Sequence, residues 1–202
     1  MKAACLFSGG KDSVYATFWG IFQGWEIILV SVESEEYSMM FHHPNINKTK
    51  LQAKEMGLEI KFVETDGKKE LEDLKKKLVE IGAEAIITGA IASEYQKQRI
   101  EKIGEELGIP VYSPLWHKED VLIKEIKEYF ETYVTAVSAE GLNEKHLGMD
   151  FKELNVQGIH KMLEGGEGET FVANAPFFKN RIAIKKWKKK WDGVRGVAEI
   201  EV

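Results

Sequence analysis

Several residue types are scarce in this chain of 202 residues, and each scarcity excludes a class of protein. With a single cysteine, Cys5, the chain cannot form an internal disulfide, a CxxC redox pair or a zinc site built from several thiolates. None of the five histidines belongs to an HExxH pair, which excludes the zincin class of metalloproteases. The longest apolar run, residues 27–32, is far too short to cross a bilayer, and no signal-peptide pattern opens the sequence. We therefore expect a cytoplasmic protein without a membrane segment.

Charged residues are abundant, and the basic ones are almost all lysine. Lysine outnumbers arginine 25 to 3, and the net charge is −5, so general binding to nucleic acid is not expected. One basic tract stands out, because residues 179–191 contain seven Lys or Arg and no acid. It is either a surface for an acidic partner or RNA, or, as we prefer, a strand over 181–187 in which apolar residues alternate with solvated lysines. The composition sets no oligomeric state.

Strand-like and helix-like segments alternate through the first half of the chain. Short apolar runs occur at residues 2–7, 26–32, 58–64, 84–88 and 109–113, with amphipathic segments between them. One such segment carries a stripe of Val14, Phe18, Ile21 and Phe22. The pattern predicts an α/β fold with a doubly wound, five-stranded parallel sheet in a domain over 1–115. After Pro114 the regular alternation of strand-like and helix-like segments stops, which predicts a smaller α+β domain over 116–202.

A glycine-containing loop follows the first predicted strand and opens the first predicted helix. It reads Ser8-Gly9-Gly10-Lys11-Asp12-Ser13. The glycines allow a tight turn with exposed amides, the helix directs its positive end at the same place, and Lys11 adds a full charge. These features suit a phosphate chain at the carboxyl edge of the sheet. The loop is not a Walker A motif, since Asp12 follows the lysine and the upstream glycine is missing.

The loop matches the SGGKDS signature of the PP-loop, or N-type, ATP pyrophosphatases, and further segments narrow the resemblance. They are Tyr37–Ile46, Gly89–Arg99, Pro114–Trp116 and Gly165–Phe171, followed by Ala175–Phe177. In these segments the chain resembles the diphthine–ammonia ligase family from residue 3 to about 178. It departs from the family pattern at His43, Gly168 and Asn174, and the loss of an aromatic residue at 168 would reshape the acceptor pocket.

The resemblance implies an enzyme, a ligase that forms C–N bonds. ATP and Mg²⁺ would be its cofactors. Its partners would be ammonium and translation elongation factor 2, whose modified histidine, diphthine, becomes diphthamide. The reaction would pass through an acyl-adenylate and release AMP and pyrophosphate. Its cleft would have to stabilise the negative charge that accumulates as a carboxylate approaches a phosphate.

Specific residues follow from the loop, the sheet edge and the resemblance. We predict Lys11 and Asp12 as catalytic residues, with Asp12 also a metal ligand. The predicted nucleotide contacts are Ser8, Gly9, Gly10, Lys11, Ser13, Ser31, Gly89 and Arg99. The predicted acceptor contacts are His42, Tyr95, Gln96, Glu167, Glu169 and Thr170. Carboxylates and aromatic faces in this set suit the quaternary ammonium of diphthine, and Glu167 or Glu169 would form a cage with Tyr95, Phe41 or Trp116.

Two other functions are compatible with the same loop. One is a PP-loop adenylating enzyme that acts on tRNA or a small molecule. The other is an adenine-nucleotide sensor that binds without turnover. The acidic balance and the single cysteine weigh against the first, and the glycine-rich segment at 164–178 weighs against the second.

Overall fold

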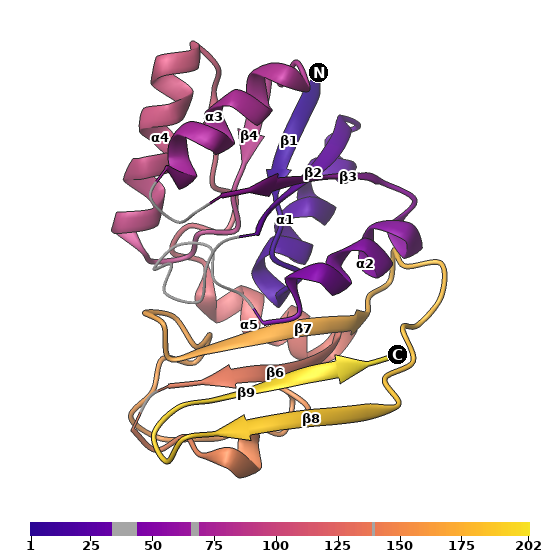
Figure 1. Ribbon diagram of the computed structural model, residues 1–202, viewed down its shortest axis with the longest axis vertical. Helices are drawn as coiled ribbons and strands as arrows, with labels where there is room; N and C mark the ends of the chain where they lie inside the picture. The colour runs from indigo at the N-terminus through magenta and orange to yellow at the C-terminus, as the bar shows by residue number, and fades with distance from the viewer. Residues whose placement is uncertain (34–43, 66–68, 139) are drawn as a thin grey trace.

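The computed structural model describes residues 1–33, 44–65, 69–138 and 140–202. Two sheets lie one above the other, with the first half of the chain above and the second half below (Figure 1). Among the described residues, no helix is long and apolar enough to cross a bilayer.

The upper sheet is parallel and has the strand order β3-β2-β1-β4-β5. Its strands and helices alternate along the chain: β1 Lys2–Leu6, α1 Lys11–Phe22, β2 Glu26–Glu33, α2 Thr49–Met56, β3 Glu59–Glu64, α3 Glu70–Glu80, β4 Ala85–Ile87, α4 Glu94–Leu107 and β5 Val111–Tyr112. A short 3₁₀ turn, η1 Ile46–Lys48, precedes α2. The reversal of strand order at β1 and β4 confirms the predicted doubly wound sheet.

The central strands β1, β2 and β4 of this sheet are largely apolar on both faces because helices cover both. Side chains of α1 and α2 pack against one face of the sheet, and those of α3 and α4 against the other. Gly57, Gly82 and Gly108 end three of the helices at φ values of 70°, 64° and 68°, as expected for glycine in the left-handed region. The helices therefore end where the sequence indicates.

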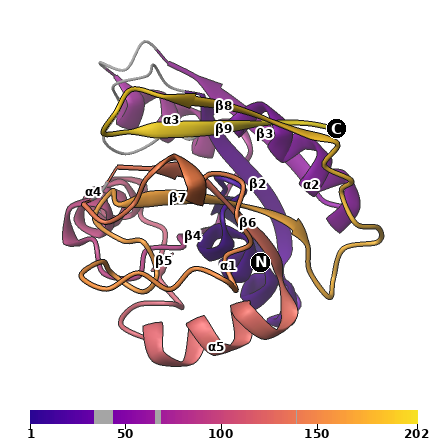
Figure 2. The same ribbon diagram turned by 90° about the horizontal axis from the view of Figure 1, so that it is seen from below.

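The lower sheet is antiparallel with the order β7-β6-β9-β8. Helix α5 Glu119–Tyr129 leads into β6 Glu131–Val137, and η2 Glu144–His146, β7 Gly168–Asn174, β8 Lys186–Trp191 and β9 Gly196–Glu201 follow. Helix α5 lies on the same side of the molecule as α1 (Figure 2), where Tyr15 and Phe130 pack together. One continuous core joins the two sheets through these helices. The domain boundary after residue 115 stays a prediction.

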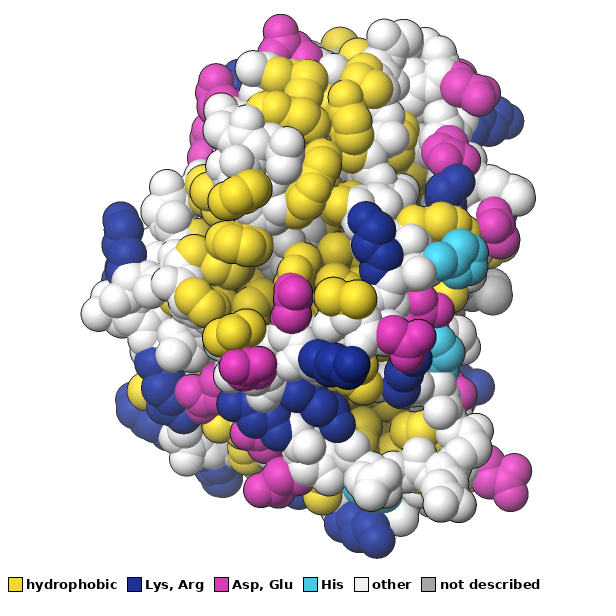
Figure 3. Space-filling view, turned by 180° about the vertical axis from the view of Figure 1, so that it is seen from behind, with side chains coloured by type: hydrophobic (Ala, Val, Ile, Leu, Met, Phe, Trp, Pro, Cys, Tyr) yellow, Lys and Arg dark blue, Asp and Glu magenta, His cyan; other side chains and the backbone are white. Residues whose placement is uncertain are grey.

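One local prediction was wrong. The basic strand begins at Lys186 rather than at 181; Ile182 lies before it, buried, and its amide donates to the Ala173 carbonyl. The stripe on α1 is only partly buried, since Val14 is inaccessible but Phe18 and Phe22 are 37% and 78% exposed. Hydrophobic side chains therefore gather on the back face of the molecule, the side of α1 and α5 (Figure 3).

Candidate active site

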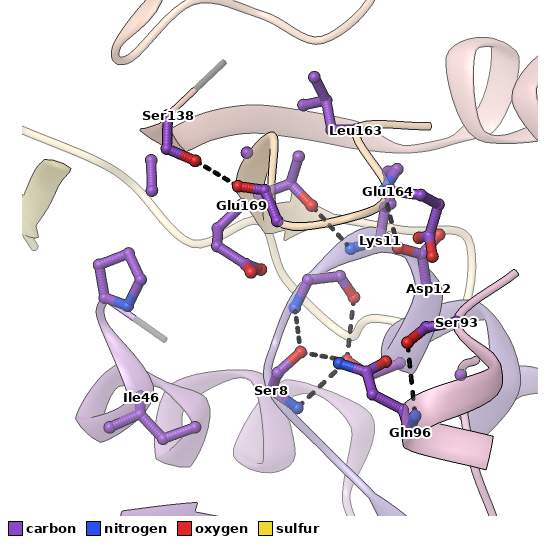
Figure 4. Close-up of a pocket in the computed structure, with 18 of the residues that line it drawn as sticks. Ser8, Lys11, Asp12, Ile46, Ser93, Gln96, Ser138, Leu163, Glu164 and Glu169 are labelled. Carbon is purple, nitrogen blue, oxygen red and sulfur yellow. Dashed lines mark hydrogen bonds and ion pairs between the residues drawn. The ribbon is translucent and has the colours of Figure 1, made fainter. Parts of the chain in front are cut away.

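A cleft of about 980 Å³ separates the carboxyl edge of the upper sheet from the lower sheet. Its upper wall comes from the ends of β1, β2 and β4 and from the start of α4, and its lower wall from β6, β7 and the β8–β9 hairpin. Ligands of doubly wound sheets bind at this edge, where the strand order reverses. Figure 4 shows the phosphate loop, α4 and β7 contributing side chains to this space.

The loop after β1 is held by its own serines. Gly9 has a φ of 79°, a conformation that costs a residue with a β-carbon about 1–2 kcal/mol. The Ser13 hydroxyl accepts hydrogen bonds from the Ser8 and Gly9 amides, at 3.3 and 3.1 Å, and donates one to the Gly10 carbonyl at 3.0 Å. Ser13 therefore shapes the turn from inside, and the loop begins α1 with its amides gathered at the cleft.

The lower sheet grips this loop from the other side. Thr170 of β7 accepts a hydrogen bond from the Lys11 amide at 3.1 Å, and the Val172 amide donates to the Gly9 carbonyl. The buried amide nitrogen of Gln52 on α2 donates to the carbonyls of both Gly9 and Val172, at 2.8 and 2.9 Å. The position of the loop thus depends on residues from both halves of the chain.

Charged groups concentrate beside the loop. The Lys11 ammonium pairs with Asp12 Oδ2 at 2.7 Å and is itself buried. Burial raises the pKa of Asp12, and the neighbouring Lys11 opposes this effect. The other oxygen, Oδ1, is buried and has no hydrogen-bond partner among the described residues. Asp12 therefore has one oxygen available to a cation in the cleft.

Glu164 belongs to this cluster, although the sequence analysis did not single it out. Figure 4 shows its carboxylate beside Asp12. Burial raises the pKa of Glu164 to about 7; the charges of Asp12 and Glu169 act in the same direction, and Lys11 acts against them. The preceding Leu163 has a φ of 57°, which is uncommon for a branched side chain and marks a constrained turn. The only sequence feature that pointed to Glu164 was its position at the start of the Gly- and Glu-rich stretch.

Most of the predicted residues meet at the cleft. Its lining includes Ser8, Gly10, Lys11, Asp12, Ser13, Gly89, Tyr95, Gln96, Glu169 and Thr170. Gly89 lets β4 approach α1 closely, since a β-carbon there would lie 2.9 Å from backbone atoms of Asp12 and Ser13. The roles assigned to these residues stay predictions.

The structure places four other predicted residues away from the cleft lining. Ser31 is buried and donates to the Phe7 carbonyl, because alternation along β2 turns Val30 and Val32 to the cleft instead. The Arg99 guanidinium lies 3.7 Å from the centre of the Tyr95 ring. These two positions do not support the predicted nucleotide contacts.

Gly9 and Glu167 also lie outside the cleft lining, each for a different reason. The Gly9 carbonyl is engaged by Gln52 and Val172, so this glycine supports the loop from behind. Glu167 accepts a hydrogen bond from the His160 amide at 2.6 Å and lies outside the lining, as does Trp116. Of the two glutamates proposed for the cation cage, Glu169 alone reaches the cleft. His42 and Phe41 lie outside the described residues.

The two halves of the chain match two parts of one known family. Residues 1–111 match the diphthamide synthase N-terminal domain, and residues 118–202 match the diphthamide synthase C-terminal domain. The diphthine–ammonia ligase of Rattus norvegicus is 31% identical, with 91% of this chain and 83% of that protein covered. The diphthine–ammonia ligase of Saccharomyces cerevisiae is also 31% identical over 89% of this chain, which spans 34% of the yeast protein.

A solved structure supports the fold. A predicted subunit of tRNA methyltransferase from Methanocaldococcus jannaschii superimposes with a TM-score of 0.51 at 17% identity, covering 87% of this chain and 98% of that one. The sheet order and this neighbour define a doubly wound α/β protein whose SGGKDS loop lies at the carboxyl edge of the parallel sheet. The chain belongs to the diphthamide synthase family. This confirms the predicted family and, with it, the predicted enzyme class of C–N ligases.

Proposed function

We propose that the chain amidates the carboxylate of diphthine on elongation factor 2 with ammonium, at the expense of ATP. The observation that carries the proposal is that the SGGKDS loop and the 164–170 segment line the same cleft. A nucleotide gripped by the loop and an acceptor beside β7 would then meet within one enclosed space. Since the proposed acceptor is a translation factor, we also propose the cytoplasm as the location.

The chemistry explains why both groups are needed. A carboxylate is a poor electrophile because its charge repels a nucleophile. In the first step a carboxylate oxygen forms a bond to the α-phosphorus of ATP, and the bond from that phosphorus to the bridging oxygen breaks, which releases pyrophosphate. In the second step ammonia forms a bond to the acyl carbon, AMP leaves, and the nitrogen loses a proton. Lys11 and the positive end of α1 would stabilise the phosphate charge in the first step.

The residues at the loop also suit Mg²⁺. This ion takes oxygen ligands and typically binds through one or two carboxylates together with phosphate oxygens of the substrate. Asp12 presents a buried oxygen without a partner among the described residues, and Glu164 lies beside it. We propose these two side chains as the protein ligands, with substrate oxygens completing the site. In the described part of the chain no group of three His, Cys, Asp or Glu side chains is arranged for a metal, in keeping with a site that needs the nucleotide. The ion would neutralise phosphate charge.

The experiment is a reconstituted reaction with diphthine-bearing elongation factor 2, ATP, Mg²⁺ and ammonium. AMP is followed by chromatography and the new amide by mass spectrometry. Wild type should form both in equal amounts, and Lys11→Ala should lose AMP formation by several orders of magnitude, with its folded state verified by circular dichroism at the assay temperature. Lys76→Ala on α3, an exposed lysine outside the cleft lining, is the matched control.

The other outcomes distinguish the alternatives. ATP that binds but is never cleaved would favour a nucleotide sensor. AMP formed with an RNA acceptor but not with elongation factor 2 would favour another PP-loop adenylating enzyme. Full activity of Lys11→Ala would remove the loop from the mechanism.

A further inference from the structure

One row of residues runs straight across the lower sheet. Glu169 of β7 pairs with Ala136 of β6, Ala136 pairs with Val197 of β9, and Val197 pairs with Lys190 of β8. Directly paired residues of antiparallel strands project from the same face. All four side chains line the cleft. We call this set, Glu169, Ala136, Val197 and Lys190, the acceptor row.

The acceptor row has a distinct chemical layout. Neighbouring strands lie about 4.8 Å apart, so the backbones at its two ends are roughly 14 Å apart. The middle is a low apolar floor of Ala136 and Val197, with a carboxylate at one end and an ammonium, Lys190, at the other. Lys190 is also paired with Glu199 at 2.7 Å.

The acidic end of this row adjoins the phosphate loop. Thr170, next to Glu169, accepts the hydrogen bond from the Lys11 amide, and the charge of Glu169 acts on both Asp12 and Glu164. A group held at Glu169 therefore lies beside the place where phosphates would bind. Figure 4 shows the Glu169 side chain pointing into the cavity from β7.

We infer that the acceptor row is the subsite for the modified histidine side chain, with the quaternary ammonium against Glu169 and the aliphatic part over Ala136 and Val197. This inference rests on the proposed function. A quaternary ammonium has no N–H to donate, so it is recognised by charge and by apolar contact of its methyl groups. The row supplies both. The diphthine carboxylate is attached close to the ammonium, so binding at Glu169 directs that carboxylate to the phosphate loop.

The floor is better suited to the acceptor than to the nucleotide base. A second apolar part of the cleft, made of Leu6, Val30, Val32 and Ile46, lies at the edge of the upper sheet beside the loop. A base attached to phosphates in the loop reaches that part without crossing the charged cluster of Asp12 and Glu164. The small side chain at 136 then sets the depth available to the acceptor, which makes Ala136 a specificity-determining residue.

The test is a steric substitution in the floor. Ala136→Leu should raise the KM for diphthine-bearing elongation factor 2 by at least about tenfold, as expected when a pocket is filled by three carbons. The dissociation constant for ATP, measured by calorimetry, should stay within about twofold of wild type. Ala183→Leu makes the same change at an exposed alanine outside the cleft and should leave both constants unchanged.

Two further variants test the inference independently, in case Ala136→Leu does not fold. Val197→Ala widens the floor and should raise the acceptor KM several-fold without changing ATP binding. Glu169→Gln keeps the shape and removes the charge, and its loss of acceptor affinity should be smaller at high ionic strength, because wild-type affinity itself falls with salt.

Three results would overturn the inference. The first is unchanged acceptor kinetics in folded Ala136→Leu. The second is a parallel loss of ATP affinity in that variant, which would assign the floor to the nucleotide. The third is unchanged acceptor binding in Glu169→Gln. Failure of the proposed function is a different observation, since wild type itself would then release no AMP with this acceptor.

Discussion

Replacement of Thr170 by valine tests whether the lower sheet holds the phosphate loop. The N-cap residue of α1 is Gly10, which offers no side-chain acceptor, so the Thr170 hydroxyl supplies a capping contact from 159 residues away in sequence. Valine keeps the shape of threonine but leaves the buried Lys11 amide unpaired. Loss of a helix-capping acceptor costs about 1–2 kcal/mol. For a chain of this length that lowers the unfolding temperature by roughly 2–8 °C.

The assay is thermal unfolding by circular dichroism, paired with calorimetric titration of ATP. Thr170→Val should unfold earlier and bind ATP more weakly, because the loop is no longer fixed before the nucleotide arrives. Thr170→Ser keeps the hydroxyl and loses a methyl group, so it should retain most of the stability and nearly all of the affinity. If Thr170→Val matches wild type while Thr170→Ser is destabilised, the methyl group matters and the hydroxyl does not, and the reasoning is wrong.

Three further predictions concern the surroundings of the loop. Gly89→Ala should weaken ATP binding and lower the unfolding temperature by several degrees, because the new β-carbon meets the backbone of Asp12 and Ser13; unchanged calorimetric affinity would contradict this. Because the pKa of Glu164 is raised to about 7 from an ordinary 4.5, the folded chain keeps a proton that the unfolded chain releases. The free energy of unfolding of wild type, measured with urea, should therefore fall relative to Glu164→Gln between pH 5 and 8, and a constant difference would count against it. Burial raises the pKa of Cys5 to about 12, so a thiol reagent such as Ellman's should react with it only after unfolding, and prompt reaction in native buffer would show otherwise.

The upper sheet was predictable because each of its signals is local. Its central strands β1, β2 and β4 are mostly buried and read as apolar runs, and a glycine in the left-handed region ends three of its helices. The lower sheet carries weaker signals. Its strand β8 is an edge strand with lysine at four of six positions, a composition that protects an exposed edge and hides the apolar alternation of a strand.

The same contrast between local and long-range signals applies to the candidate site. The loop is a contiguous motif, so Ser8 to Ser13 could be assigned from the sequence. The side chains that hold it could not, because Gln52 and Thr170 meet the loop across 43 and 159 residues. The sequence of a strand also does not show which of its alternating residues face a ligand. The prediction therefore placed Ser31 at the cleft, whereas its neighbours Val30 and Val32 line it.

The electrostatics of the cleft bear on the order of events. Around the loop, the described residues bring one ammonium, Lys11, together with three carboxylates, Asp12, Glu164 and Glu169. With its carboxyl groups ionised, which for Glu164 requires a pH above about 7, such a cluster repels a polyphosphate that arrives alone and attracts cations. In the proposed reaction three cations accompany the anions: Mg²⁺ with the nucleotide, the quaternary ammonium with its carboxylate, and ammonium. The excess of carboxylates therefore favours a nucleotide that arrives with its metal ion, and the apparent affinity for ATP should rise with Mg²⁺ concentration more steeply in wild type than in Glu164→Gln.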